Sequence, residues 1–398
     1  MSQLDKLLNG VEVEWKTLGE VAEILRGVRV TKKDLLTNGK YPVVSGGTGY
    51  MGFINEYNRE ENTITIAQYG TAGYVKWQTE KFWANDICYS IKPNIEIINN
   101  RYLYFILIKM QQHLYDISNR SAIPYSIERY KILNLPIPIP CPDNPHKSLE
   151  IQAEIVRILD TFTELTAELT AELTARKKQY EYYREELLSF EEGEVEWKSL
   201  GEVFDIKNGY TPSKLNKEYW TDGTIPWFRM EDIRTNGRVL DKSIQYVNDC
   251  AIKGGKLFPA NSIIVSTSAT IGEHALITVP FLSNQRFTNL SLKKAYTDKF
   301  NIKFLFYYCF VLGEWCKNNI TIGNFAGVDM IGFKKFKIPI PPIEEQERIV
   351  AILDKFDMLV NSISEGLPKE IELRQKQYEY YRDRLLTFPS LSELRLKD

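Results

Sequence analysis

The sequence predicts an α+β protein that contains two copies of one mixed α/β domain, joined by two long helices. Three observations support this fold class. The 398-residue chain repeats itself after about half its length, each repeat contains a series of strand-like segments, and each repeat ends in a long helical segment. A chain of this length is sufficient for two or three domains.

The repeat is carried by four pairs of segments that recur in the same order. They are VEWKTLGEVAEI (13–24) with VEWKSLGEVFDI (195–206), LPIPIP (135–140) with FKIPIPP (336–342), EIVRILDTF (154–162) with RIVAILDKF (348–356), and QYEYYREELLSF (179–190) with QYEYYRDRLLTF (377–388). Nine of the twelve positions in the last pair are identical. The period is too long for a solenoid and indicates a duplicated domain.

The segments between these anchors have diverged, but they can still be aligned. TITIAQYGTAGYVKW (63–77) aligns with SIIVSTSATIGEHAL (262–276), FWAND (82–86) with FLSNQ (281–285), and RYLYFIL (101–107) with KFLFYYC (303–309). The first pair has a β-branched run, a polar turn that contains glycine, and a second strand. We therefore expect one fold that carries two different surfaces.

Each copy ends in a long amphipathic helix. The first contains no Gly or Pro from about Glu150 to Phe190, and Asn144–Pro145 resembles a helix cap followed by a first-turn proline. The second covers 343–388, with a kink expected at Gly366–Leu367–Pro368. We expect the two helices to form an antiparallel coiled coil. The residues expected to pack there are Leu165, Leu169, Leu173, Tyr180, Tyr183, Tyr378 and Tyr381.

A shorter repeat, TAELTAEL (166–173), lies within the first helix. One tetrad is about one helical turn, so each copy changes the length of the helix by about 6 Å. We interpret the tetrads as a length adjuster; the alternative is a duplication without consequence. The predicted domains are 1–148 (including the repeated segment 11–24), the helical spacer 149–190, a second globular domain 191–342, and a second helical spacer with a tail, 343–398.

Composition excludes several classes of protein. No stretch approaches the roughly 18 apolar residues of a membrane span, and the first ten residues do not resemble a secretory signal. The five Cys show no CxxC spacing, and with only three His a zinc site is not expected. We expect a cytoplasmic protein with reduced thiols and no contact with a membrane.

The charge distribution indicates a nucleic-acid partner. Residues 25–140 carry 14 Lys and Arg against 9 Asp and Glu, and residues 207–340 carry 18 against 10, although the whole chain has a net charge of −2. Two basic globular segments are thus separated by acidic helical ones.

Catalytic motifs are missing from the sequence. GGTGYMG (46–52) contains a G-x-G-x-x-G pattern, but strand-like residues follow it where a dinucleotide site requires a helix, so we expect a glycine-rich hairpin or a DNA-facing loop. There is no phosphate-binding GxxxxGK[ST] loop, no amino-methyltransferase motif and no convincing Ser/His/Asp or Cys/His set. These absences favour a binding protein over an enzyme.

The candidate DNA contacts are cations, amides and hydroxyls in the predicted loops of the two middle segments. Lys and Arg neutralise phosphates, whereas Arg reads guanine, and Gln or Asn reads adenine. In the first segment they are Arg26, Arg29, Lys32, Lys33, Gln68, Tyr69, Lys76, Asn119 and Arg120. In the second segment they are Lys207, Lys214, Arg229, Arg234, Ser266, Ser268, Gln285, Arg286 and Asn324.

The ordered set of repeated segments resembles the specificity subunit of type I restriction–modification systems, most closely the IC-like group. The resemblance covers the whole chain and is carried by VEWKTLGE/VEWKSLGE, IPIPCPDNP, EIVRILDTF, the TAEL tetrads and GLPKEIELRQKQYEYYRDRLL. It implies two target-recognition domains related by a pseudo-twofold axis. Each would read one half of a bipartite, asymmetric site in double-stranded DNA, and the helices would set the gap between the halves.

The resemblance also implies partners. The helices would dock two methyltransferase (modification) subunits, which use S-adenosylmethionine to methylate adenine N6, and the complex would include restriction and translocase subunits that use ATP and Mg. This chain would itself be non-catalytic and bind no cofactor or metal. Two other classes remain open at this point: a coiled-coil adaptor that binds proteins, and an enzyme that uses the GGTGYMG loop.

Overall fold

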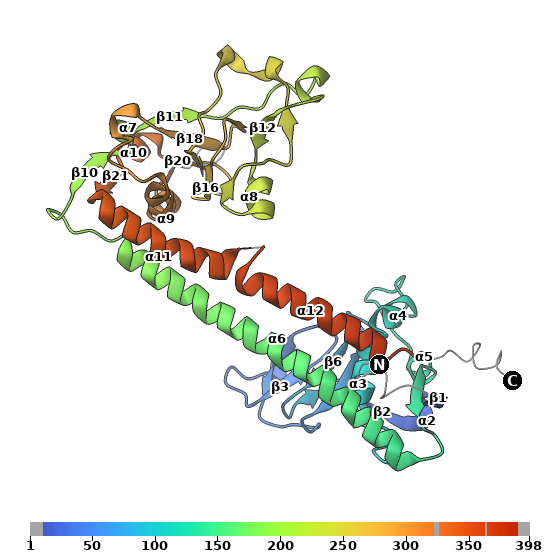
Figure 1. Cartoon of the computed structure of the whole chain (residues 1–398). Coiled ribbons are helices and arrows are strands. Elements are labelled where there is room, and N and C mark those ends of the chain that lie inside the picture. The colour runs from blue at the N-terminus through green and yellow to red at the C-terminus, as the bar shows by residue number, and fades with distance from the viewer. Residues whose placement is uncertain (1–10, 322–325, 363, 389–398) are drawn as a thin grey trace. The chain divides into compact units, whose positions relative to one another are not determined.

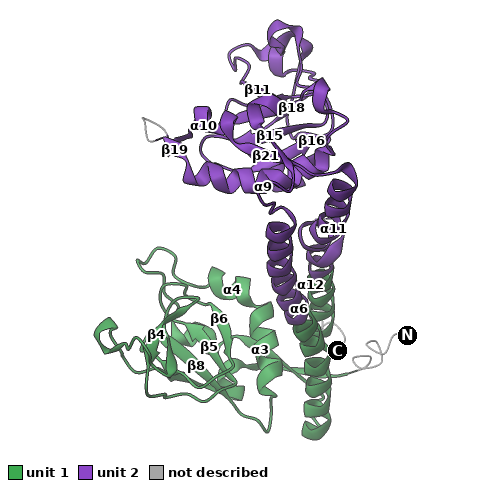
Figure 2. Cartoon of the chain, turned by 90° about the vertical axis from the view of Figure 1, so that its left-hand side faces the viewer, with its two compact units in different colours: residues 1–166, 373–398 green, residues 167–372 purple. Residues whose placement is uncertain are grey.

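The computed structural model describes residues 11–321, 326–362 and 364–388. The chain divides into two compact units (Figure 2). Unit 1 contains residues 11–166 and 373–388, and unit 2 contains residues 167–372. Each unit therefore includes one globular domain and parts of the long helices, labelled in Figure 1.

Unit 1 is built on a four-stranded antiparallel sheet with the strand order β2-β8-β5-β6, a three-stranded sheet β4-β3-β7, and a two-stranded ribbon β1-β9. Its strands are β1 (Val13–Thr17), β2 (Ala22–Arg26), β3 (Tyr41–Val44), β4 (Tyr50–Ile54), β5 (Thr63–Ala67), β6 (Val75–Gln78), β7 (Trp83–Ala84), β8 (Cys88–Pro93) and β9 (Pro136–Pro140). Its short helices are α2 (Leu18–Val21), η1 (Lys32–Asp34), α3 (Asn100–Lys109), α4 (Gln111–Asp116) and α5 (Arg129–Leu133).

Unit 2 repeats this topology with additions: a five-stranded sheet β11-β18-β15-β16-β13, a three-stranded sheet β14-β12-β17, the ribbon β10-β21 and the small pair β19-β20. Its strands are β10 (Glu196–Ser199), β11 (Phe204–Asn208), β12 (Ile225–Phe228), β13 (Val239–Leu240), β14 (Tyr246–Val247), β15 (Ser262–Ser266), β16 (His274–Ile277), β17 (Leu282–Ser283), β18 (Phe287–Leu292), β19 (Ile320–Thr321), β20 (Gly327–Val328) and β21 (Lys337–Ile340). Its short helices are α7 (Leu200–Val203), η2 (Lys217–Trp220), α8 (Met230–Asn236), η3 (Asp249–Ala251), η4 (Lys253–Gly255), η5 (Lys294–Tyr296), α9 (Ile302–Asn318) and α10 (Met330–Lys335).

The prediction of an α+β fold with two copies of one domain is confirmed. The aligned segments fall on equivalent elements, since β5–β6 and β15–β16 are both antiparallel pairs, and β3–β7 and β12–β17 are both parallel pairs. The GGTGYMG segment connects β3 to β4 as an antiparallel hairpin with a bulge, as expected for a glycine-rich hairpin. A strand follows the glycines, so the loop lacks the helix that a dinucleotide site needs.

The long helices are α6 (Pro145–Leu187), α11 (Ile343–Asn361) and α12 (Gly366–Leu385). In each unit α6 runs beside the helix of the second repeat in the opposite direction (Figure 1). Phe162 stacks on Tyr381 at 5.1 Å between ring centroids in unit 1, and Tyr183 stacks on Phe356 at 5.5 Å in unit 2. The predicted packing residues Leu173, Tyr180, Tyr378 and Tyr381 belong to the two cores or pack against them. Leu165 and Leu169 are half-buried.

The predicted kink at Gly366–Leu367–Pro368 coincides with the end of a break in the helix. The helix ends earlier, at Asn361, and a new helix begins at Gly366. Gly366 has φ +74°, and a Cβ there would lie 2.4 Å from the Met358 carbonyl oxygen, so the start of α12 requires a glycine. Pro368 then lies in the first turn of α12, where its missing N–H costs no helical hydrogen bond.

A buried glutamine attaches each domain to its helix in the same way. In unit 2 the Gln346 amide donates to the Lys299 and Pro341 carbonyls at 2.9 and 2.8 Å and accepts from the Asn301 N–H at 2.9 Å. In unit 1 Gln152 accepts from the Asn99 N–H at 2.8 Å and donates to the Ile97 carbonyl at 3.1 Å. Both side chains are fully buried, so these contacts hold the domain against the helix in a single register.

Replacement of Gln346 by leucine is expected to lower the free energy of unfolding by about 3 kcal/mol. The substitution conserves volume but leaves the Asn301 N–H and the Lys299 and Pro341 carbonyls without their amide partner. An unpaired buried group costs about 1–3 kcal/mol. Chemical denaturation of the purified chain would measure this change. Gln112→Leu, at an exposed position of α4, is the matched control and should change stability by less than about 0.5 kcal/mol. An equally small effect at Gln346 would contradict the anchoring role.

His274 makes the stability of unit 2 depend on pH. Its ring is 1% exposed, packs edge-to-face on Phe310 at 4.5 Å, and has an Nε2 atom with no hydrogen-bond partner among the described residues. Burial, followed by the charge of Arg238, lowers the pKa of His274 to about 3. The folded state therefore keeps this ring neutral at pH values where the unfolded state, with its ordinary pKa of about 6.5, binds a proton.

Unit 2 is therefore expected to lose stability as the pH falls below about 6.5. The slope is about 1.4 kcal/mol per pH unit, which amounts to about 2 kcal/mol at pH 5. Denaturation at pH 7 and pH 5 would compare the chain with His274→Leu, which removes this proton site, and with His113→Gln, an exposed control. Identical pH slopes for the wild-type chain and His274→Leu would contradict the assignment.

Candidate nucleic-acid interface

Both units form the same tight turn at the end of a central strand. In unit 1 the turn covers 68–73, where the Gly73 N–H donates to the Ala67 carbonyl at 2.8 Å. In unit 2 it covers 267–272, where the Gly272 N–H donates to the Ser266 carbonyl at 3.0 Å. Gly73 and Gly272 have φ of +87° and +90°, a region that favours glycine. The repeated frame thus places two equivalent turns, and their side chains differ.

A second loop lies beside each turn. In unit 1 Asn119 and Ser126 exchange backbone hydrogen bonds of 2.7 and 3.2 Å, and the Gly70 N–H donates to the Tyr125 carbonyl. In unit 2 the pair β19–β20 takes this place, with the Val328 N–H donating to the Thr267 carbonyl at 3.1 Å. The predicted residue Asn324 lies outside the described residues.

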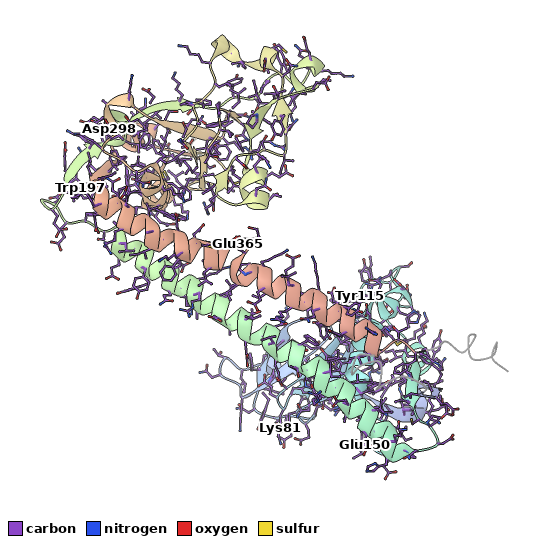
Figure 3. All side chains as sticks on the ribbon, viewed as in Figure 1. Lys81, Tyr115, Glu150, Trp197, Asp298 and Glu365 are labelled. Atoms are coloured by element: carbon purple, nitrogen blue, oxygen red, sulfur yellow. The ribbon has the colours of Figure 1, made fainter. Side chains whose placement is uncertain are left out.

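Several predicted contacts in unit 1 gather around this turn and loop. The exposed Arg120 guanidinium lies over the rings of Tyr115 (labelled in Figure 3) and Tyr125, at 5.0 and 4.9 Å. Tyr69 bridges to Ser126 of the loop, and the Asn119 side chain accepts from the Ser121 and Ala122 N–H groups. An arginine held between two aromatic rings can bind a nucleic acid in two ways. The bases can stack on the rings, and the guanidinium can pair with a phosphate.

The other predicted residues of unit 1 lie in different places. Arg26 ends β2, and its Nε donates to the Asp86 carbonyl at 2.9 Å. Lys76 lies over the Tyr50 ring at 4.6 Å beside the glycine-rich loop. Gln68 is half-buried, with an Oε1 atom that has no partner among the described residues. The exposed cations Arg29, Lys32 and Lys33 lie in and before η1.

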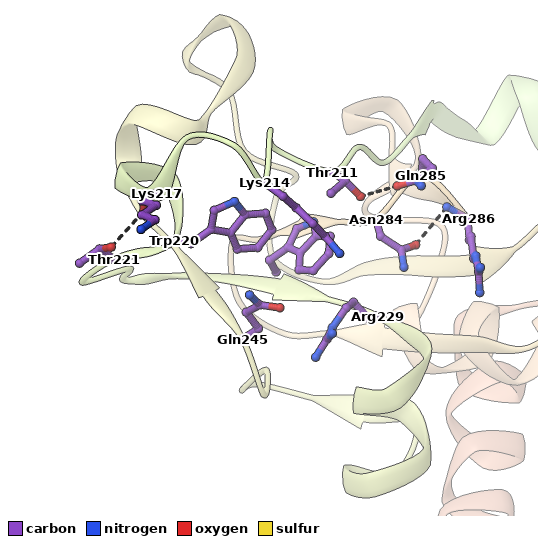
Figure 4. A pocket seen from close by; sticks show the side chains of 11 residues that line it. Thr211, Lys214, Lys217, Trp220, Thr221, Arg229, Gln245, Asn284, Gln285 and Arg286 are labelled. Carbon is purple, nitrogen blue, oxygen red and sulfur yellow. Dashed lines mark hydrogen bonds between the residues drawn. The ribbon is translucent and has the colours of Figure 1, made fainter.

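Unit 2 contains an open cavity of about 630 Å³. Four predicted contacts line it: Lys214, Arg229, Gln285 and Arg286. The structure adds residues that the sequence analysis missed: Thr211, Lys217, Trp220, Thr221, Trp227, Gln245 and Asn284 (Figure 4). The described lining thus holds four cations, three side-chain amides, two indoles and no carboxylate.

Hydrogen bonds fix the walls of this cavity and leave polar ends available. The Thr211 hydroxyl donates to the Gln285 Oε1, so the Gln285 NH₂ group keeps its donors. Both indole N–H groups are already used, by the Ser213 carbonyl for Trp220 and the Tyr210 carbonyl for Trp227, each at 3.0 Å. The two indoles meet edge-to-face at 5.0 Å and form an apolar wall.

Arg229 is held at the rim by the helix that follows it. The Asp232 carboxylate accepts from the Arg229 backbone N–H at 2.7 Å and from the Ile244 N–H at 2.5 Å. Burial raises the pKa of Asp232, and these two hydrogen bonds oppose the rise. The Arg229 guanidinium lies 3.0 Å from the Glu231 carboxylate, and its buried Nε has no hydrogen-bond partner among the described residues. Asp232 is thus a positioning residue for Arg229.

The remaining predictions in unit 2 are more scattered. Lys207 on β11 and Arg234 on α8 are exposed, and Ser268 is half-buried in the turn. Ser266 is wrong as a direct contact, because it is the last residue of β15, is fully buried, and donates its hydroxyl to the Ser268 carbonyl at 3.0 Å.

Among the described residues no cluster of His, Cys, Asp and Glu is suited to a metal ion. None of the described helices combines the length and apolarity that crossing a bilayer demands.

The chain matches the family model for the type I restriction modification DNA specificity domain twice, over residues 10–176 and 192–373. It is 43% identical to the type I restriction enzyme EcoR124I/EcoR124II specificity subunit of Escherichia coli, over 98% of each chain. It is 59% identical to the EcoprrI specificity subunit of Escherichia coli, over 49% of this chain and 50% of that one.

Solved structures have the same fold. The crystal structure of the S subunit of a type I restriction-modification system from M. genitalium superimposes with a TM-score of 0.62, over 98% of this chain and all of that one, at 17% identity. At this identity the match concerns the fold alone. The two family matches cover both halves of the repeat, so the chain belongs to the family of type I restriction–modification DNA specificity proteins.

Proposed function

We propose that this chain is the non-catalytic DNA-specificity subunit of a type I restriction–modification complex. The domain in each unit recognises one half of a bipartite, asymmetric site in double-stranded DNA. The observation that carries this proposal is the cavity of unit 2. Arginine, lysine and amide side chains converge there without a carboxylate in the described lining, which is the combination that reads base edges and holds phosphates.

The domain in unit 1 recognises the other half-site, which differs in sequence. Its turn and loop have the same backbone hydrogen bonds as those of unit 2, but they present Tyr69, Asn119 and Arg120. Two recognition domains that share a backbone fold but differ in their side chains suit an asymmetric site, because each half-site can then have its own base sequence.

The long helices serve two roles in this proposal. They set the gap between the half-sites, and they dock two copies of the modification subunit, which methylates adenine N6. Restriction and translocase subunits complete the assembly. S-adenosylmethionine, ATP and Mg belong to those partners, the specificity chain itself binds no cofactor, and the complex acts in the cytoplasm.

A methylome tests the proposal. The chain would be expressed with its modification subunit in a host without DNA methylation, and N6-methyladenine would be mapped with and without the chain. We expect one bipartite motif with a fixed gap that depends on the chain. A folded, assembled complex that produces no motif would contradict the proposal and favour a protein-binding adaptor.

A further inference from the structure

The cavity of unit 2 has room for a group that enters it from outside. Side chains that read paired bases project into a groove of the duplex, whereas the side chains here surround a hollow of about 630 Å³. Pockets that enclose a small ligand usually measure about 300–1,000 Å³. The shape of the cavity therefore suits a group the size of one nucleotide better than the edge of a base that stays in the stack.

The apolar wall of the cavity suits a flat ring. Trp220 and Trp227 meet edge-to-face at 5.0 Å, and both indole N–H groups are held by backbone carbonyls. The Trp220 side chain lines the cavity and is only half-buried, so part of its ring can be reached from the cavity. An aromatic side chain that is fixed in this way is a surface on which a nucleobase can stack.

Two neighbouring amides of the cavity both offer hydrogen-bond donors. The Gln285 Oε1 accepts from the Thr211 hydroxyl, as drawn in Figure 4. The Asn284 Oδ1 accepts from the Arg286 backbone N–H at 3.0 Å. Since both amide oxygens are engaged, the two NH₂ groups are the ends available to a ligand. Gln245 also lines the cavity, and its amide can supply an acceptor.

The cations of the cavity suit the backbone of a nucleotide. Lys214, Lys217 and Arg286 belong to its lining, and Lys and Arg side chains neutralise phosphates. A nucleotide that has left the stack of a DNA strand carries a phosphate on each side. A free nucleotide carries the same base and a phosphate, so the experiment below separates the two sources.

A thymine becomes unpaired whenever an adenine is methylated in a duplex, because methyltransferases take their target base out of the stack. The pairing edge of thymine has two carbonyl oxygens with an N–H between them, which matches two amide donors and one acceptor. We infer that the cavity of unit 2 receives this unpaired thymine, stacked on Trp220 and hydrogen-bonded to Asn284 and Gln285. The inference rests on the proposed function, which supplies the methylation of adenine.

Photo-crosslinking of the assembled complex gives a direct test. The chain and its modification subunit are bound to their own duplex, in which iodouracil replaces the thymine opposite the target adenine, in one half-site at a time. Irradiation is expected to join the base to Trp220 for one half-site and to leave Trp220 unmodified for the other. Mass spectrometry of the digested complex locates the crosslink. The free iodouracil nucleotide, without DNA, should not label Trp220.

The affinity of Trp220→Ala for DNA supplies a second measurement. The variant should bind the natural duplex about 5- to 150-fold more weakly, the range for one base stacked on an aromatic side chain. It should bind a duplex that lacks this thymine base as the wild-type chain does. Trp220→Phe, which keeps a ring, should recover most of the affinity. Trp83→Ala is the matched control in unit 1, since the Trp83 indole N–H also donates to a backbone carbonyl, that of Val28, at 2.8 Å. Its effect should be equal on both duplexes.

Thermal melting shows whether each variant is folded. If the chain directs methylation, but neither half-site labels Trp220 and Trp220→Ala affects both duplexes equally, the inference is overturned while the proposed function stands. Labelling of Trp220 by the free nucleotide would also overturn it, because the cavity would then bind nucleotides without DNA. An assembled complex that methylates no site would overturn both.

Discussion

Arg286→Ala is expected to relax the recognised sequence at one position of one half-site, whereas Lys214→Ala should weaken binding to every sequence alike. Both residues line the cavity of unit 2. Arginine can donate two hydrogen bonds to guanine, a contact worth about 1–3 kcal/mol of discrimination, which corresponds to about 5- to 150-fold. Lysine contributes one charge to a phosphate and carries no sequence information.

The measurement is binding of the assembled complex to its own duplex and to duplexes with single base changes, over a range of salt concentrations. Lys214→Ala should reduce the salt slope by about 1 and leave the order of the duplexes unchanged. Arg286→Ala should compress the differences between duplexes at one position. Lys355→Ala, an exposed residue of α11 outside the cavity, is the control. If Arg286→Ala weakened all duplexes equally, Arg286 would be a phosphate contact.

The repeated fold could be predicted because the two halves of the sequence can be aligned with each other. Residues 63–77 and 262–276 share few side chains, yet both have a β-branched run followed by a turn that contains glycine, and both form an antiparallel strand pair. The cap at Asn144–Pro145 was predictable for a similarly local reason, since the Asn144 side chain accepts from the Lys147 N–H at 3.1 Å. Local hydrogen bonds and periodicity leave direct traces in a sequence.

The cavity could be predicted only in part. Thr211 and Gln285 are 74 positions apart, and their contact depends on the pairing of β11 with β18, which no local pattern indicates. Gln245 was missed for the same reason. The two tryptophans close to lysines in 214–227 were a signal in the sequence that could have indicated this part of the cavity. Ser266 was misplaced because it was assigned to a loop, whereas it ends the buried strand β15. One position along a strand reverses the direction of a side chain.

Deletion of one TAEL tetrad is expected to shorten the gap of the recognised site by one or two base pairs and to leave both half-sites unchanged. Removal of 166–169 or of 170–173 gives the same chain, since the two tetrads are identical. It shortens α6 by about 6 Å and turns it by about 40°. One base pair of B-DNA corresponds to about 3.4 Å and about 34°. The gap is therefore expected to become shorter by one or two base pairs.

The helix is expected to survive this deletion because the threonine that begins the tetrads and the threonine that follows them make the same internal hydrogen bond. Thr166 donates to the carbonyl four residues earlier at 2.8 Å, and Thr174 does the same at 2.9 Å, so the shortened helix can make the same bonds. The methylome of the deletion variant measures the outcome, and Thr170→Ala, which keeps the length, should retain the original gap. A changed half-site with an unchanged gap would show that the tetrads affect recognition itself. An unchanged motif would show that α6 does not set the spacing.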